Sequence, residues 1–568
     1  MFQNKYILKQ VIVGGIFLSI FLIATVLIFN IPISVKSTYS LTTQTEDGVT
    51  ISFNVFEPQP DLYEMHNGNA KKKAIIIGHG YMANKEIMKS YAIELAAAGF
   101  IAVAFDFRGH GQSSGVLEED NLINDVRAIK AYLASRDDVD INNMGYIGYS
   151  MGGFPGNQIV AEDTDFKCFI GVGTGLPTED SYPEYAVNTT SGRRLNVLMI
   201  QARFDEAVSL ERVKEGMALR LGLNAEDIDA NKMYGSFEDG NASMIFLDDN
   251  TNHLLLAWDQ DFAREARNWV ISTFPGVRNP DDNFYVNLRI IILIFQLFGG
   301  LGLFFVIIKP FSNLILKKKE EELEKETYKI ELPDISAKDL ILQTLVYSLI
   351  LGFPGVLIFM PITFFLPLGT AGQVLMLLFG QAFGILVFLW RNGKKVDMSL
   401  LDILKGPFKG RDHLLKQIGL GVILAIILYL VLFLSFGLNY FAILPSITKI
   451  LWIPIFFAIG FCIFIIFGIQ FQVILQNKFT ADLKGITQAT ILTFGLQLLY
   501  LATYLLVFSI FIFRSFFTFG VYTPVAIVTT LIASSVSVVL YKKTGNISTG
   551  TIVITFFIIL EICTVSAL

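Results

Sequence analysis

The chain has 568 residues, of which 17% are charged, and its mean hydropathy is +0.55. This composition is too apolar for an ordinary soluble protein, and the length is too great for one compact domain, so part of the chain is expected to lie in lipid. The formal net charge is only -6, and the soluble part has no concentrated basic patch, which argues against nucleic acid as a partner. The three cysteines lie far apart in different segments, so their spacing indicates neither a disulfide framework nor a metal site.

Apolar runs long enough to cross a bilayer are unevenly placed along the chain. A helix needs about 20 residues to cross a hydrocarbon core of about 30 Å. One such run precedes residue 30, none falls between residues 31 and 285, and a near-continuous series follows. We therefore expect a transmembrane signal anchor over residues 1–36, a soluble domain over residues 37–280, and a membrane domain of about eight transmembrane helices over residues 281–568.

The first apolar run, Val11 to Phe29, follows Lys5 and Lys9 and has no small-x-small cleavage site behind it. This pattern favours a retained anchor over a cleaved signal peptide and predicts that the next segment is exported. Prolines interrupt the third of the nine expected spans, which is therefore the weakest. The eight spans after the anchor are expected near residues 288–308, 342–366, 374–390, 419–436, 451–474, 489–513, 521–541 and 549–565.

Lysine and arginine accumulate in alternate loops between these spans. The positive-inside rule assigns the basic loops to the cytoplasm, and the short loops on the other side hold little beyond Lys449 and Arg514. The asymmetry predicts a multi-pass protein of the cell membrane with a cytoplasmic N-terminus and with residues 37–280 outside the cytoplasm. The run from Lys317 to Lys329, rich in alternating Lys and Glu, indicates a solvated cytoplasmic helix, with a partner-binding helix as the alternative.

The apolar pattern of the soluble domain changes along the chain. Residues 39–45 and 49–56 alternate apolar and polar side chains around Asp47-Gly48, a pair that favours a β-hairpin. The short apolar runs that follow are typical of parallel strands buried on both faces, and helical periodicity fills the gaps between them. The expected fold class is α/β, a doubly wound and mostly parallel sheet, joined to an all-α polytopic membrane domain. The six runs are 74–77, 101–105, 144–148, 169–172, 197–200 and 244–247.

The third of these runs leads directly into Gly148-Tyr149-Ser150-Met151-Gly152. A strand, a sharp turn and a helix are the context that a G-x-S-x-G nucleophile elbow requires. Glycine is needed at Gly148 and Gly152 because the turn is strained and side chains there would collide with neighbouring elements. Ser150 is therefore the candidate nucleophile, and an ordinary Gly-Ser turn is the simpler alternative.

With this motif the chain resembles the α/β-hydrolase superfamily of serine hydrolases over about residues 39–275, less than half of its length. His79-Gly80 ends the first buried run, as the HG of the oxyanion loop does in that family. The resemblance implies that the backbone N–H groups of Tyr81 and Met151 stabilise an oxyanion.

A second segment carries the same resemblance. The sequence Asp106-Phe107-Arg108-Gly109-His110-Gly111-Gln112-Ser113 is similar to the D-x-R-G-H-G-x-S segment of lysophospholipase-like and aminopeptidase-like members of the superfamily. In that family these residues usually shape the loop, so the resemblance implies a structural role for the acid, the arginine and the histidine. The membrane domain resembles no family that we can name.

The family carries its catalytic residues in the order Ser, then Asp or Glu, then His. Asp205 follows the fifth buried run and is the expected acid, with Glu206 as its nearest competitor. His253 follows the sixth run and is the expected base, because no other histidine lies between Ser150 and the membrane domain.

The predicted activity is cleavage of an ester, thioester or amide through an acyl-enzyme on Ser150, of the esterase, lipase or peptidase type, without a cofactor or a metal. The expected partners are a small-molecule or lipid acyl substrate and membrane lipids, and the oligomeric state stays open. The alternatives are an acyltransferase, or a transporter or receptor whose hydrolase-like ectodomain binds without turnover. Residues 173–196 leave room for little or no cap, so the site is open, or covered by residues 205–240 or by the membrane.

Overall fold

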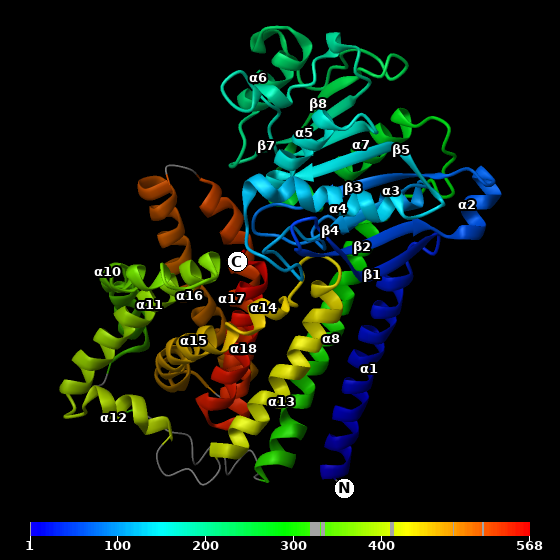
Figure 1. Cartoon of the computed structure of the whole chain (residues 1–568). Coiled ribbons are helices and arrows are strands. Elements are labelled where there is room, and N and C mark those ends of the chain that lie inside the picture. Colours follow the sequence, from blue (N-terminus) through cyan, green and yellow to red (C-terminus); the bar gives the residue numbers. More distant parts are fainter. Residues whose placement is uncertain (1, 318–329, 331–334, 409–413, 481, 514–515) are drawn as a thin grey trace. The chain divides into compact units, whose positions relative to one another are not determined.

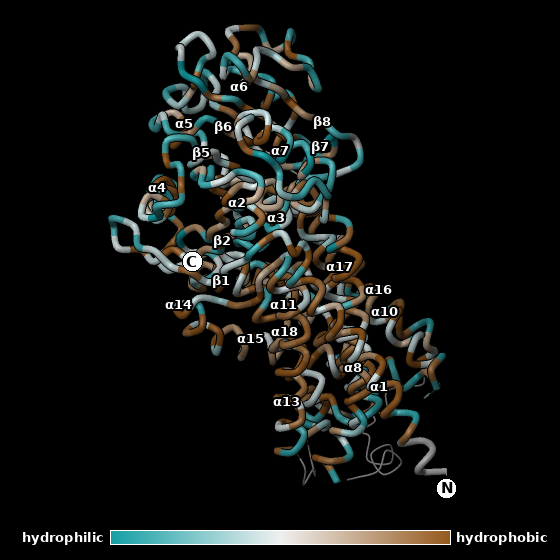
Figure 2. The backbone as a smooth tube through the Cα atoms, turned by 90° about the vertical axis from the view of Figure 1, so that its right-hand side faces the viewer, coloured by the Kyte–Doolittle hydropathy of each residue, from teal (hydrophilic) through white to brown (hydrophobic). Residues whose placement is uncertain are grey.

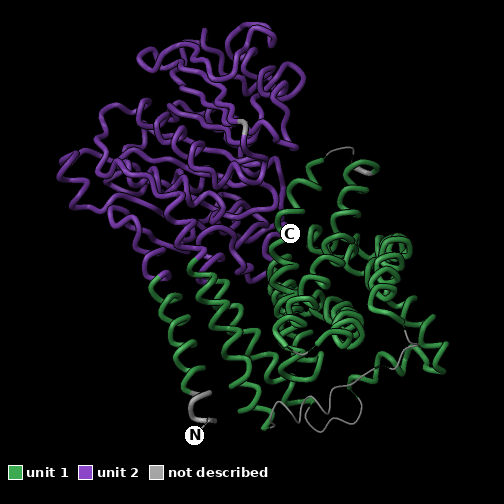
Figure 3. Tube along the Cα trace, turned by 180° about the vertical axis from the view of Figure 1, so that it is seen from behind, with its two compact units in different colours: residues 1–23, 295–433, 449–563 green, residues 24–294, 434–448, 564–568 purple. Residues whose placement is uncertain are grey.

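The computed structural model describes residues 2–317, 330, 335–408, 414–480, 482–513 and 516–568 (Figure 1). The chain forms two compact units, and each is discontinuous in sequence (Figure 3). Unit 1 comprises residues 1–23, 295–433 and 449–563, and unit 2 comprises residues 24–294, 434–448 and 564–568. Residues 318–329 of the predicted cytoplasmic helix lie outside the described residues.

Unit 2 is built on an eight-stranded sheet with the strand order β1-β2-β4-β3-β5-β6-β7-β8. β1 and β2 form the predicted hairpin, and β2 pairs antiparallel with β4. All later neighbours are parallel, which confirms the predicted α/β fold class with its mostly parallel sheet. The strands are β1 (Val35–Gln44), β2 (Thr50–Pro58), β3 (Lys72–Gly78), β4 (Ile101–Phe105), β5 (Val139–Tyr149), β6 (Phe166–Val172), β7 (Asn196–Phe204) and β8 (Ser243–Asn252).

Helices cover both faces of this sheet. Ile76 of β3 and Val103 of β4 share one buried apolar cluster with side chains of α4, α5 and α6. Their neighbours Ile75 and Ala102 are equally buried but lie outside that cluster, because successive side chains of a strand point to opposite faces. α3 and α7 contact each other and the sheet at this second face. The helices are α2 (Pro60–Asn67), α3 (Lys89–Ala97), α4 (Leu122–Ala134), α5 (Gly153–Glu162), α6 (Leu210–Leu221) and α7 (Gln260–Thr273).

The loop after β4 is held by buried charges. The carboxylate of Asp106 accepts from the backbone N–H of Lys85 at 2.7 Å and of Gln112 at 2.9 Å, and it pairs with the Lys85 ammonium. Burial opposes the ionisation of Asp106, but the nearby charge of Lys85 holds the pKa of this carboxyl below its usual value. Arg108 donates to the carboxylates of Asp47 and Asp125. These contacts give the loop a structural role.

Two short segments from the C-terminal half belong to unit 2. Lys89 donates to the carbonyl of Leu438 at 2.7 Å and to Oδ1 of Asn439 at 3.1 Å. The backbone N–H of Leu568 donates to the carbonyl of Gly109 at 3.0 Å. Residues 434–448 thus contact the start of α3, and residues 564–568 contact the loop after β4. No local sequence pattern predicts these contacts.

Nine helices within the described ranges are long and apolar enough to cross a membrane. They fall on the nine predicted spans, and Figure 2 shows hydrophobic residues over most of their length. This set fits a multi-pass membrane protein. The helices are α1 (Phe2–Asn30), α8 (Val286–Leu316), α10 (Ala337–Thr363), α11 (Gly369–Lys394), α13 (Leu414–Leu432), α15 (Ile453–Phe467), α16 (Leu483–Phe508), α17 (Phe517–Thr544) and α18 (Ile547–Val565).

The span that was expected to be weakest, α10, runs through Pro354 and Pro361 without a break. Within unit 1 it packs closely on α11, where a Cβ added to Gly384 would lie 2.4 Å from the carbonyl oxygen of Tyr347. Close packing at glycine is typical of membrane helices, and neighbouring helices there tolerate prolines that would break an isolated helix.

Asp106→Ala is expected to lower the free energy of unfolding of unit 2 by about 3–5 kcal/mol, because it leaves the Lys85 ammonium buried without its partner. Hydrogen–deuterium exchange of the sheet peptides in denaturant, on the detergent-solubilised protein, measures this loss. The exposed control Asp137→Ala should change it by less than about 0.5 kcal/mol. Equal stability of the two variants would show that the buried pair is not what holds the loop.

Candidate active site

Ser150 lies in the turn between β5 and α5 with a left-handed backbone, φ 51°. Such a conformation is strained for a residue with a side chain. The neighbouring glycines make the turn possible. A Cβ added to Gly148 would lie 2.5 Å from the carbonyl oxygen of Gly152, and one added to Gly152 would lie 2.8 Å from the backbone of Gly78. Side chains at these two positions would therefore force the turn away from the sheet.

The structure places His253 within hydrogen-bond distance of both Ser150 and Asp205. The Oγ of Ser150 lies 3.0 Å from Nε2 of His253, and Nδ1 of His253 lies 3.0 Å from both carboxylate oxygens of Asp205. Their side chains come from the ends of β5, β7 and β8, at the carboxyl edge of the sheet where ligands of α/β folds bind. The side chains of His253 and Asp205 are 3% and 1% exposed, so little water competes for this contact.

Asp205 and its competitor Glu206 make different contacts. Oδ1 of Asp205 also accepts from the backbone N–H groups of Ala207 and Val208, both at 2.9 Å, which fixes the carboxylate in place. Oε2 of Glu206 instead accepts from the backbone N–H of His253, at 3.3 Å. Burial raises the pKa of Glu206. The geometry therefore gives the contact with the imidazole to Asp205.

The HG segment lies directly against Ser150. A Cβ added to Gly80 would lie 3.1 Å from Cβ of Ser150, so the backbone there passes close to the hydroxyl. Nε2 of His79 accepts from the backbone N–H of Phe107 at 3.1 Å, so its Nδ1 carries the proton and donates to the carbonyl of Gly80 at 2.7 Å. These bonds orient the peptide that leads to Tyr81.

Tyr81 and Met151 are the two residues whose N–H groups we expect to form the oxyanion hole. Tyr81 follows Gly80, and its carbonyl contacts Nε2 of His110 at 2.5 Å. Met151 lies in the single 3-10 turn Ser150–Gly152 that opens α5. Tyr81 therefore adjoins Gly80, which passes close to Ser150, and Met151 adjoins Ser150 in the chain. Their role as oxyanion donors stays a prediction.

Two residues that the sequence did not single out also position the imidazole. The hydroxyl of Tyr149 donates to the carbonyl of His253 at 3.0 Å, and the two rings stack with centroids 5.4 Å apart. Burial raises the pKa of the Tyr149 hydroxyl, which therefore stays a donor. Gly173 has φ +56°, and a Cβ there would lie 3.1 Å from the His253 ring. Glycine directly after β6 was the only sequence signal for this close approach.

A family model matches the part of the chain that holds the turn of Ser150. Residues 69–220 match the family model described as "Serine aminopeptidase, S33". This part of the chain is an α/β-hydrolase domain. Among the described residues, no group of three or more His, Cys, Asp or Glu side chains could hold a metal ion.

Curated relatives match only part of this hydrolase domain. An uncharacterized protein of Mycobacterium tuberculosis is 27% identical over 109 residues, which are 19% of this chain and 36% of that protein. An uncharacterized 31.7 kDa protein of Escherichia coli, from the traX-finO intergenic region, is 27% identical over 130 residues, or 22% of this chain and 41% of that protein. The chain thus spans well under half the length of these relatives.

Solved structures are similar to less than half of the chain. The esterase Pf2001 of Pyrococcus furiosus is 18% identical with a TM-score of 0.32, over 42% of this chain and 94% of that one. A hypothetical protein of Pseudomonas aeruginosa is 16% identical with a TM-score of 0.32, over 43% of this chain and 95% of that one.

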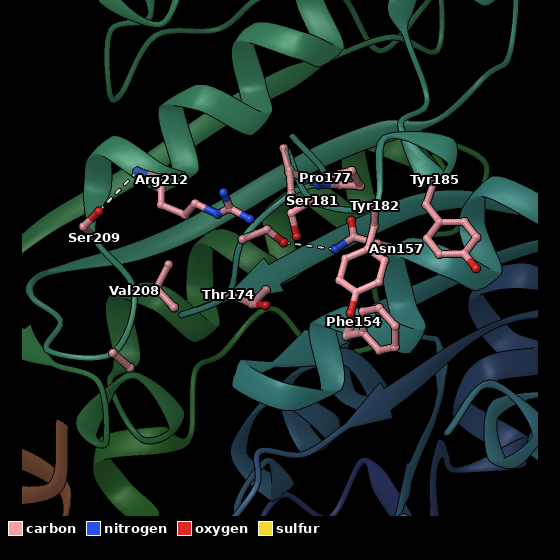
Figure 4. A pocket seen from close by; sticks show the side chains of 13 residues that line it. Phe154, Asn157, Thr174, Pro177, Ser181, Tyr182, Tyr185, Val208, Ser209 and Arg212 are labelled. Atoms are coloured by element: carbon pink, nitrogen blue, oxygen red, sulfur yellow. Dashed lines mark hydrogen bonds between the residues drawn. The ribbon is translucent and has the colours of Figure 1, made fainter. Parts of the chain in front are cut away.

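The hydrolase domain has no large cap, as its sequence predicted. Residues 173–195, all of which the structure describes, contain only the short 3-10 turns Pro183–Tyr185 and Thr189–Ser191. This segment and the start of α6 instead line a cavity of about 500 Å³ (Figure 4). Of the segment 205–240, the residues Ala207, Val208, Ser209 and Arg212 line this cavity.

Proposed function

We propose that this protein is a membrane-bound serine hydrolase that cleaves an ester, thioester or amide through an acyl-enzyme on Ser150. The observation that carries the proposal is the chain of hydrogen bonds from Asp205 through His253 to Ser150, with 3.0 Å at each step. A domain that only binds a ligand has no need of a serine in a strained turn, paired with an imidazole that a buried carboxylate orients.

The chemistry follows from these positions. His253 Nε2 takes the proton of Ser150 as Oγ bonds to the carbonyl carbon of the substrate, and the N–H groups of Tyr81 and Met151 stabilise the oxyanion. The bond to the leaving alcohol, thiol or amine then breaks, and that group takes the proton from His253. A water molecule, deprotonated by His253, attacks the acyl-enzyme and releases the carboxylic acid and Ser150.

Asp205 supports this cycle by holding the imidazole. Its carboxylate accepts a hydrogen bond from the Nδ1–H of His253, so that the lone pair of Nε2 faces the serine hydroxyl. It also stabilises the imidazolium that forms when His253 takes a proton.

The nine apolar helices of the described ranges fit a multi-pass membrane protein and support placing the proposed enzyme in a membrane. Because the basic residues fall in alternate loops, we further propose that the N-terminus is cytoplasmic and that the hydrolase domain lies outside the cytoplasm. The first helix then serves as a retained anchor. Within unit 1 it packs on α8, where a Cβ added to Gly302 would lie 2.4 Å from the ring of Phe17.

Ser150→Ala is expected to abolish labelling of the membrane protein by a fluorophosphonate probe, because the probe reacts only with an activated serine hydroxyl. Gel fluorescence measures the labelling, and immunoblotting checks the expression level. Ser191→Ala, which removes an exposed serine from the segment between β6 and β7, should label like the wild type. A folded wild-type protein that does not label would favour the alternative of a hydrolase-like domain that binds without turnover.

Asp205→Asn is expected to lower kcat for an activated ester on the order of 10⁴-fold, because the amide holds the imidazole in the wrong tautomer. Glu206→Gln is the matched control, since Oε2 of Glu206 accepts from the backbone N–H of His253; its kcat should fall less than about tenfold. Steady-state kinetics on purified protein measure both. A larger loss in Glu206→Gln than in Asp205→Asn would transfer the role of the acid to Glu206.

The proposed orientation predicts which side of the membrane two exposed lysines face. In a Cys462→Ser background, which removes the exposed native thiol, Lys71→Cys in the hydrolase domain should react with a membrane-impermeant maleimide in intact cells. Lys395→Cys, in a predicted cytoplasmic loop, should react only after permeabilisation. The reverse pattern would place the hydrolase domain in the cytoplasm.

A further inference from the structure

Residues that line one cavity lie close in sequence to the predicted triad, or close to residues that contact it. Phe154 lies in the first turn of α5, shortly after Ser150, and the backbone N–H groups of Ala207 and Val208 donate to the carboxylate of Asp205. Gly175 lies in the same loop as Gly173, which passes close to the ring of His253. A volume of about 500 Å³ suits a small-molecule group. A part of the substrate bound there would therefore lie next to the reacting carbonyl.

Arg212 brings a positive charge into this cavity. Its side chain extends from the first turn of α6 into the space that Figure 4 shows. A Cβ added to Gly175 would lie 3.8 Å from Cγ of Arg212, so the side chain passes over the loop after β6. Among the described residues, its one carboxylate partner within 4.0 Å is Glu215, at 3.9 Å and 54% exposed. A pair that long and exposed contributes little, so the guanidinium keeps donors for a ligand.

The rest of the lining has no acidic side chain that would neutralise the charge of Arg212. None of its 13 residues, all of them described, is an aspartate or glutamate. Aromatic rings form one side (Figure 4): Phe154 and Tyr182 lie with centroids 4.8 Å apart, and Tyr185 stacks on Tyr182 at 6.3 Å. Tyr182 has a left-handed backbone, φ 54°, which is strained and turns its ring toward the cavity. A substrate with a cationic amine would meet only repulsion from Arg212 here.

We propose that this cavity is the specificity subsite of the enzyme and that Arg212 binds an oxyanion, a carboxylate or a phosphate, carried by the substrate. The aromatic side binds the apolar part that joins this anion to the scissile carbonyl. The substrate is thus an anionic ester, thioester or amide, and not a peptide recognised by its free amino terminus. This inference rests on the proposed hydrolase function and names the substrate class of the same site.

The test compares substrates that differ in one charge. The first arm uses nitrophenyl monoesters of linear dicarboxylic acids, each beside its neutral carboxamide, so that the anion is on the acyl side. The second arm uses short-chain acyl esters of glycerol phosphate and of glycerol, so that the anion is on the leaving alcohol. The full-length protein in detergent should show a kcat/KM at least about tenfold higher for the anionic member of one pair, because hydrogen bonds to a charged group are strong.

Arg212→Gln should bring that anionic-to-neutral ratio of kcat/KM close to one, a loss of about 10- to 100-fold, mainly through KM. Arg212→Lys should restore part of the ratio, because it restores the charge but not the paired donors. Arg264→Gln is the matched control and should leave the ratio unchanged. Arg264 is 39% exposed, against 40% for Arg212, and both pair with an acid three residues away on their own helix.

Fluorophosphonate labelling of the same samples shows whether the catalytic residues are assembled in each variant. A wild-type enzyme that labels and cleaves neutral esters, but prefers no anionic substrate in either arm, overturns this inference and leaves the proposed function in place. A ratio that survives in a labelled Arg212→Gln protein overturns it equally. A folded wild type that neither labels nor cleaves any ester removes the proposed function, and the subsite with it.

Discussion

The close approach of the turn after β5 to the end of β3 is the constraint on which the site depends. Gly152 lies so near the backbone of Gly78 that any side chain there would collide with it. The same contact sets the left-handed conformation of Ser150 and places the HG loop beside its hydroxyl. The candidate nucleophile and the two expected oxyanion donors are therefore positioned by one steric interaction between neighbouring parallel strands, and not by separate loops.

The supporting contacts extend this rigidity to the other side of the site. Asp205 is fixed by N–H groups of its own loop before it contacts the imidazole, and Tyr149 holds the backbone of His253 from the residue next to the serine. Hydrogen bonds that orient a base in advance reduce what must be reorganised during reaction. The buried pair of Asp106 with Lys85 does the same for the loop that borders the HG segment.

Local sequence patterns predicted the strands and the turn, whose formation depends on residues that are neighbours in the chain. Continuous apolar runs located the buried strands, and the glycines around Ser150 located the turn, because both signals come from neighbours in the chain. The placement of β4 between β2 and β3, the contact of Tyr149 with His253, and the inclusion of residues 434–448 in unit 2 depend on tertiary packing. The sequence also predicted that prolines weaken α10, yet the helix continues through them. Whether a membrane helix tolerates proline depends on the packing around it, which the sequence pattern does not show.

The proposed subsite lies in a part of the domain that the shared catalytic motifs do not include. The family match over residues 69–220 includes the nucleophile turn, and an α/β-hydrolase sheet supports many acyl substrates. The cavity lies within the same matched range and is built from the start of α5, the short segment after β6 and the residues 207–212 that lead into α6. Helical periodicity alone makes Arg212 an ordinary surface arginine. A positive charge on a cavity wall raises the affinity for anions and lowers it for cations. Because the described lining of the proposed subsite holds Arg212 and no Asp or Glu, we expect it to favour an anionic substrate over an amine on the same scaffold.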